Sequence, residues 1–128
     1  MALKEKALRR LGEKLASSSI PFAAGGEWLL CQRGLSDIYH AFDIVVAEAD
    51  ADRADHVLTK LGMRQMQESP DGVFCCHYHF DGADITLLAV RGEAVVTDGE
   101  ANVLGVTIPL MQSDAWARIS QKIHGGAL

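Results

Sequence analysis

The chain has 128 residues, 48% of them apolar, so it has the length of one domain and too much apolar character for a disordered protein. Its 17 acidic and 12 basic side chains give a net charge of −5, which disfavours broad nucleic-acid binding through phosphate contacts. No apolar run approaches the roughly 20 residues that span a bilayer, so we expect a single domain over residues 1–128 with no membrane partner.

The first half of the chain predicts helices that alternate with extended segments. Apolar residues recur at helical spacing in two charged stretches, and a β-rich apolar run lies between them. In chain order we expect a helix over Ala2–Ala16, an extended piece at Ile20–Ala24, a short helix at Glu27–Gln32, a strand at Ala41–Ala47, a helix to Leu61 with Asp50 as its N-cap, and a strand at Met63–Gln67 followed by a turn at Ser69–Gly72.

The second half predicts a β-hairpin and a final helix. Two β-rich runs, Val73–Phe80 and Ala83–Val90, flank Asp81–Gly82, a pair that suits a type I′ turn because both turn positions need positive φ. Shorter strands are expected at Ala94–Thr97 and Val103–Val106, and a helix from about Ser113 to Lys122. This order predicts an α/β (α+β) fold in which helices flank a mixed β-sheet.

Three features carry candidate chemistry. Gly25–Gly26 precedes Glu27–Trp28 between an extended piece and a helix, where glycines allow a phosphate to approach the backbone. Asp43 lies inside an apolar strand, where a carboxylate costs free energy unless it is paired, and Asp84 follows the hairpin turn. The plain structural alternatives are a tight turn for the glycines, a strand-end carboxylate for Asp43 and a turn-flanking carboxylate for Asp84.

Together these features resemble the nucleotidyltransferase superfamily, in its minimal and kanamycin-nucleotidyltransferase-like branches, over about residues 5–123. That pattern has a glycine pair before a short helix, a strand with two acids at alternate positions, and a third acid on a later strand. Gly25–Gly26–Glu27–Trp28 matches the opening motif, Asp43 falls at the second acid position, and Asp84 falls at the third.

The resemblance implies a nucleoside triphosphate bound with Mg²⁺, or alternatively with Mn²⁺ or Zn²⁺. It places the nucleotide at Gly25, Gly26, Glu27 and Trp28, and makes Asp43 and Asp84 the catalytic and metal-binding residues. One departure is important: Ala41 occupies the first acid position, and alanine cannot bind metal. Two-metal chemistry needs ligands for both ions, so we expect transferase activity to be weak or lost.

A second cluster suggests a different metal site. His77 and His79 alternate along a predicted strand and therefore share a face, and a two-residue turn would place His79 opposite Asp84 and His77 opposite Thr86. This nitrogen and oxygen set suits Zn²⁺ or Mn²⁺ better than Mg²⁺. The alternative is that both histidines line a solvated sheet face and His79 only hydrogen-bonds Asp84.

The missing acid also favours a non-catalytic module of the same fold that binds a protein partner, as in a toxin–antitoxin or regulatory pair. The mean hydropathy of +0.07 favours self-association as a homodimer. Three cysteines form no disulfide framework, and the N-terminus lacks the apolar run of a signal peptide, so we expect a reduced, cytoplasmic protein.

Overall fold

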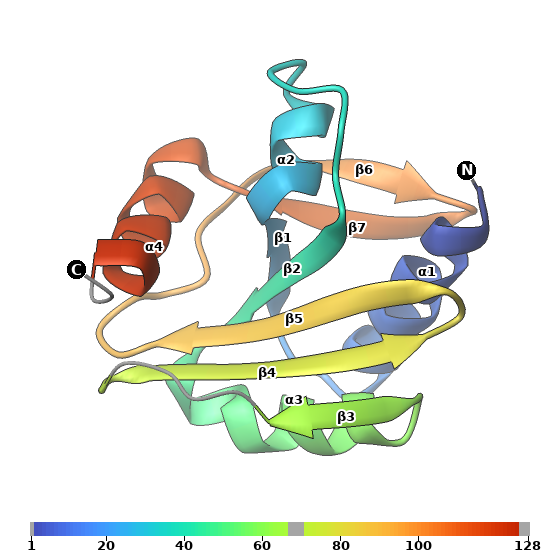
Figure 1. The fold of residues 1–128 in the computed structure, drawn as a ribbon, viewed down its shortest axis with the longest axis horizontal. Helices are drawn as coiled ribbons and strands as arrows, with labels where there is room; N and C mark the ends of the chain where they lie inside the picture. The colour runs from blue at the N-terminus through green and yellow to red at the C-terminus, as the bar shows by residue number, and fades with distance from the viewer. Residues whose placement is uncertain (1, 67–70, 126–128) are drawn as a thin grey trace.

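A mixed seven-stranded sheet forms the centre of the molecule in the computed structural model, which describes residues 2–66 and 71–125 (Figure 1). The strand order across the sheet is β3-β4-β5-β2-β1-β7-β6. In chain order the elements are α1 (Ala2–Ser17), β1 (Phe22–Gly25), α2 (Gly26–Gln32), β2 (Ala41–Val46), η1 (Glu48–Asp50), α3 (Ala51–Thr59), β3 (Met63–Met66), β4 (Val73–Phe80), β5 (Ala83–Val90), β6 (Thr97–Val103), β7 (Val106–Met111) and α4 (Ser113–Gly125). The predicted class, a mixed sheet flanked by helices, is confirmed.

Helices α1 and α3 cover one face of the sheet (Figure 1). Helix α1 turns Ala7, Leu8, Leu11 and Leu15 inward, as its helical spacing predicts, and all four are fully buried. The sheet residues on this face are equally apolar, which gives one continuous core that excludes water. On β2, β5 and β4 they include Ile44, Ile85, Leu87, Cys76 and Tyr78.

The opposite face of the sheet is covered by α4 over only part of its area. The Trp116 indole of α4 packs over Gly25 at the end of β1. Along β5 on this face, burial rises towards α4: Asp84 is exposed, Thr86 is half-buried, and Leu88 is buried. Among the described residues, the β3–β4–β5–β2 part of this face therefore has an open, polar end.

The predicted hairpin is confirmed residue by residue. Strands β4 and β5 pair antiparallel around Asp81 and Gly82, whose φ angles of 52° and 76° are both positive, as a type I′ turn requires. His79 lies opposite Asp84, and His77 lies opposite Thr86. Strand β2 pairs in parallel with β5, so the candidate residues of three strands share one face.

Two sequence-based assignments are wrong. The strands predicted at Ala94–Thr97 and Val103–Val106 are replaced by the hairpin β6–β7, in which Leu104 and Gly105 form the turn with φ angles of 50° and 90°. Strand β6 is a solvent-exposed edge strand of polar and small residues, so it lacks the apolar alternation that marks a strand.

Asp50 does not cap α3 through its side chain. A short 3₁₀ turn precedes the helix, and the Asp50 carboxylate instead accepts a hydrogen bond from Arg53 at 2.7 Å. The predicted strand end at Gln67 and the first part of the predicted turn, Ser69–Pro70, lie outside the described residues. Within residues 2–66 and 71–125, no helix is both long enough and apolar enough to cross a bilayer.

Candidate functional site

The candidate residues stand in two rows that run across the open end of the sheet. One row passes from Ala41 on β2 to Asp84 on β5 and His79 on β4. The row beside it passes from Gly25 on β1 to Asp43, Thr86 and His77. These rows exist because β2 lies between β1 and β5, and cross-strand partners point to the same side of a sheet.

The glycine pair lies at the junction of β1 and α2, as predicted, and both glycines are needed for close packing. A Cβ on Gly25 would lie 2.4 Å from the Trp116 ring, and a Cβ on Gly26 would lie 2.1 Å from Oδ2 of Asp43. Gly26 also has a φ of 66°, which L-residues rarely adopt. The pair therefore brings the Asp43 carboxylate directly against the start of α2.

Asp43 is held in a half-buried position that disfavours its charged form. Burial and, to a smaller extent, the negative charge of Glu27 raise the pKa of its carboxyl, and His124 at the end of α4 opposes them; the net pKa is about 6. Within the described part of the chain, the Asp43 carboxylate makes no side-chain hydrogen bond or ion pair. A carboxylate in this state is typical of a functional position, because its structural cost is otherwise unexplained.

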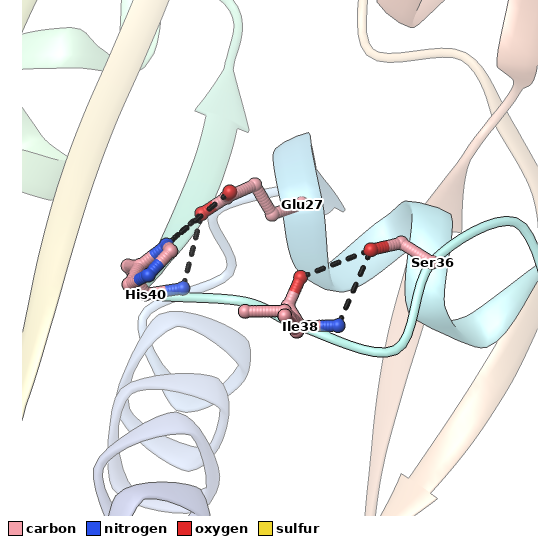
Figure 2. Close-up of polar contacts among 4 residues, drawn as sticks. All are labelled: Glu27, Ser36, Ile38 and His40. Atoms are coloured by element: carbon pink, nitrogen blue, oxygen red, sulfur yellow. Dashed lines mark hydrogen bonds and ion pairs between the residues drawn. The ribbon is translucent and has the colours of Figure 1, made fainter.

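Glu27 is fixed by the residue that leads into β2 (Figure 2). Its Oε1 accepts a hydrogen bond from the His40 backbone N–H at 3.0 Å and lies 3.2 Å from Nδ1 of the same residue. The hydrogen bonds from His40 lower the pKa of Glu27. Glu27 thus supplies a second carboxylate near Asp43 from α2, and His40 sets its orientation.

Trp28, the last residue of the glycine motif, is a core residue. Its side chain is 3% exposed, and its ring packs edge-on against Phe42 with centroids 5.9 Å apart. The indole is therefore turned away from solvent, and it positions α2 against β2. A nucleotide at this motif would meet the backbone of α2 rather than the Trp28 ring.

Two histidine contacts line the open end of the face. Nδ1 of His79 lies 2.8 Å from Oδ1 of Asp84, and Nδ1 of His77 lies 2.9 Å from Oγ1 of Thr86. The sheet is hollowed here, with a volume of about 520 Å³. The residues that line this hollow are Ala41, Met63, Gln65, His77, Tyr78, His79, Asp84 and Thr86.

The residues present do not match a two-ion magnesium site. Ala41 stands opposite Asp84, so the first acid position carries a methyl group at the centre of the site. One oxygen of the Asp84 carboxylate, Oδ1, contacts His79, and burial opposes the ionisation of Asp43. Among the described residues, no group of three or more His, Cys, Asp or Glu side chains could enclose a metal ion.

Sequence reasoning missed two residues that shape this site. His40 donates a backbone hydrogen bond to Glu27, and Trp116 fills the space above Gly25. Neither has a local signal, because both contacts join segments that are distant in sequence. Two sequence patterns did predict which side chains share this face: the alternation of Ala41 and Asp43 along a strand, and the register of the Asp81–Gly82 hairpin.

No family model and no curated protein sequence matches the chain. Solved structures do match it. A putative nucleotidyltransferase from Thermotoga maritima superposes with a TM-score of 0.70 at 14% identity, covering 91% of this chain and 82% of the other. A crystal structure of ANT(2″)-Ia in complex with adenylyl-2″-tobramycin gives a TM-score of 0.63 at 12% identity, covering 87% and 70%.

A solution structure of the antibiotic-resistance factor ANT(2″)-Ia gives a TM-score of 0.62 at 13% identity, covering 88% of this chain and 66% of the other. The TM-scores establish a shared fold, but at identities of 12–14% a shared fold does not imply a shared activity. The agreement with the first of these structures extends over 91% of this chain. This chain has the nucleotidyltransferase fold.

Proposed function

We propose that the chain is a nucleotidyltransferase-like domain that binds a nucleoside triphosphate with a divalent cation beside Asp43, and that it has lost efficient nucleotidyl transfer. Asp43 carries the proposal. It occupies the family's second acid position, lies against Gly26, and has a pKa raised to about 6 by burial. A cation brought by the triphosphate would favour its charged form and offset the cost of burial.

The hollow at the open end of the same face supports a ligand of nucleotide size, and Thr86, which lines it, is the cross-strand partner of Asp43. Its volume of about 520 Å³ falls within the range of small-molecule sites, roughly 300–1,000 Å³. Its polar groups include the Asp84 carboxylate, the Thr86 hydroxyl and the Gln65 amide, which can donate to or accept from a ribose or a base.

The loss of transfer follows from Ala41. In-line displacement by two metal ions needs carboxylates that hold both ions, and alanine supplies none. Asp84, the partner of Ala41 across the strands, is itself the residue that the resemblance places at the third acid position, so it does not replace the missing ligand.

Calorimetric titration with ATP and GTP, with and without Mg²⁺ or Mn²⁺, tests the binding proposal. We expect metal-dependent binding in wild type and its loss in Asp43→Ala. Asp37→Ala is the matched control, because Asp37 is exposed in the loop between α2 and β2. If no nucleotide binds under any condition, or if Asp43→Ala binds like wild type, the proposal is wrong.

Restoring the first acid tests the explanation for lost transfer. Ala41→Asp should increase metal-dependent nucleotide affinity, because it places a second carboxylate in the row next to Asp43. Ala49→Asp adds the same charge at an exposed position outside the site and serves as control. Equal affinities in the two variants would contradict the explanation.

A second candidate function, protein-partner binding, is favoured by three exposed apolar side chains near the end of α2. Leu30, Leu35 and Ile38 are 38%, 72% and 64% exposed. The loop that carries two of them is internally ordered, since Oγ of Ser36 accepts from the Ile38 N–H at 3.2 Å and donates to the Ile38 carbonyl oxygen at 3.1 Å (Figure 2).

Apolar side chains on an ordered loop are suited to contact another protein. Sedimentation velocity of wild type and of Leu35→Asp/Ile38→Asp tests whether that protein is a second copy. We expect the double variant to weaken self-association if this loop forms the dimer contact. A wild-type chain that stays monomeric at high concentration would exclude the homodimer.

A further inference from the structure

His77 and His79 form a pair of imidazoles whose Nδ1 atoms are both engaged by strand β5. They are two residues apart on β4, so they share the open face and their Cα atoms are roughly 6.8 Å apart along the strand. Both line the same hollow, and the His79 side chain is 58% exposed. A solute can therefore reach His79 from solvent.

The Asp84 contact determines which nitrogen of His79 is available. An ionised carboxylate can only accept, so Nδ1 of His79 carries the proton and donates it to Oδ1 of Asp84. The neutral ring then keeps its lone pair on Nε2. A carboxylate that holds Nδ1–H in this way is the arrangement that orients metal-bound histidines and raises their basicity.

Thr86 can hold His77 in the same way. Its hydroxyl accepts a hydrogen bond as readily as it donates one, so Nδ1–H of His77 can donate to Oγ1 and leave Nε2 as the ligand atom. Each imidazole thus has an outer partner on β5, and its Nε2 has no hydrogen-bond partner among residues 2–66 and 71–125. The two partners are themselves two residues apart on β5, so they hold both rings from the same side.

We propose that Nε2 of His77 and Nε2 of His79 bind one divalent transition-metal ion of the Zn²⁺ class, with Asp84 as the positioning residue for His79. Imidazole nitrogens suit Zn²⁺, Ni²⁺ and Cu²⁺ and are poor ligands for Mg²⁺. Two protein ligands leave the remaining coordination positions of the ion open to water or to an incoming ligand. This proposal uses neither Asp43 nor Gly26 and so does not rest on the nucleotide proposal, although both place a ligand in the same hollow, which Asp84 and Thr86 line.

Calorimetric titration of untagged protein with ZnCl₂ and with NiCl₂, in the absence of nucleotide, tests the site. We expect about one equivalent of Zn²⁺ to bind, and each of His77→Ala and His79→Ala to lose this binding. Asp84→Ala should weaken binding by about 10–100-fold without abolishing it, as outer-partner substitutions do. MgCl₂ should not compete.

His56→Ala is the matched control, because His56 is exposed on α3 and lies outside the hollow. Circular dichroism checks that each variant is folded. As a second measurement, ¹⁵N NMR of the imidazoles should show Zn²⁺ shifting Nε2 of His77 and His79 while Nδ1 keeps its proton. Wild-type affinity in both histidine variants, or no Zn²⁺-dependent shift of either ring, would overturn the proposal and leave two solvated cross-strand pairs.

Discussion

Asp43 is the residue at which stability and function conflict most clearly. We propose that its side chain binds a ligand, but burial in the sheet and the charge of Glu27 disfavour its ionised form. The pKa of about 6 in the folded chain lies above the ordinary value of 3.8. Between these two values the folded state keeps a proton that the unfolded state has released, so Asp43 lowers stability as pH rises through this window.

Asp43→Asn should therefore stabilise the chain at pH 8, because it removes the charge and keeps the shape. We expect an increase of roughly 3 kcal/mol in the free energy of unfolding at pH 8, and little change well below pH 3.8, where Asp43 is protonated in both states. Urea denaturation across this pH range measures the effect. An equal effect at both ends of the range would contradict the assigned cause.

Gly26 allows this carboxylate to lie against the helix start. Gly26→Ala should destabilise the chain by at least about 1 kcal/mol, because the positive φ disfavours any Cβ and the new methyl group would meet Asp43. Adding Asp43→Ala to this variant should relieve the clash, so that only the destabilisation from the positive φ at position 26 remains. Chemical denaturation of the two single variants and the double variant measures this coupling, and strictly additive effects would rule out the contact.

At the scale of elements, α3, β3 and β4 are joined by one partly buried polar cluster. Asp55 of α3 accepts hydrogen bonds from Arg64 of β3 at 2.8 Å and 3.0 Å, and from the Tyr78 hydroxyl of β4 at 2.5 Å. Burial opposes ionisation of Asp55, but the hydrogen bonds from Arg64 and Tyr78 outweigh it and lower its pKa. The cluster fixes α3 to the edge of the sheet.

Tyr78→Phe should lower the free energy of unfolding by about 1–2 kcal/mol at pH 7, since the buried ring stays and one hydrogen bond to a charged group is lost. Tyr39→Phe is the matched control, because the Tyr39 hydroxyl makes no hydrogen bond to the described residues, although its ring packs on Phe42. Thermal and urea unfolding measure both variants. A loss of the same size in the control would mean that the Asp55 contact is unimportant.

Elements with strong local signals could be predicted from the sequence. The Asp81–Gly82 turn fixed the register of β4 and β5, and helical spacing placed α1 within a residue of its observed end. The β6–β7 hairpin could not be predicted, because β6 is polar and its turn, Leu104–Gly105, lacks the usual Asn-Gly or Asp-Gly pair. Such an edge strand is specified by its partner rather than by its own composition.

At the scale of the whole molecule, the order of glycine pair, acidic strand and later acid predicted the fold, which the structural neighbours share. The sequence also predicted that His79 would meet Asp84. It could not predict that Glu27 and His124 would act on Asp43, nor that Trp116 would cover Gly25. Those contacts arise only when α2 and α4 pack on the sheet.

The central claim is that this fold retains one acidic position beside the glycine pair and has lost the two-ion site at Ala41. Counting Mn²⁺ ions by electron paramagnetic resonance in the presence of ATP tests it most directly. The count is made in a His79→Ala background, so that the imidazole pair does not contribute. We predict at most about one Mn²⁺ per nucleotide-bound chain, and a second ion when Ala41→Asp is added. Two bound Mn²⁺ ions in the chain that keeps Ala41 would contradict the account.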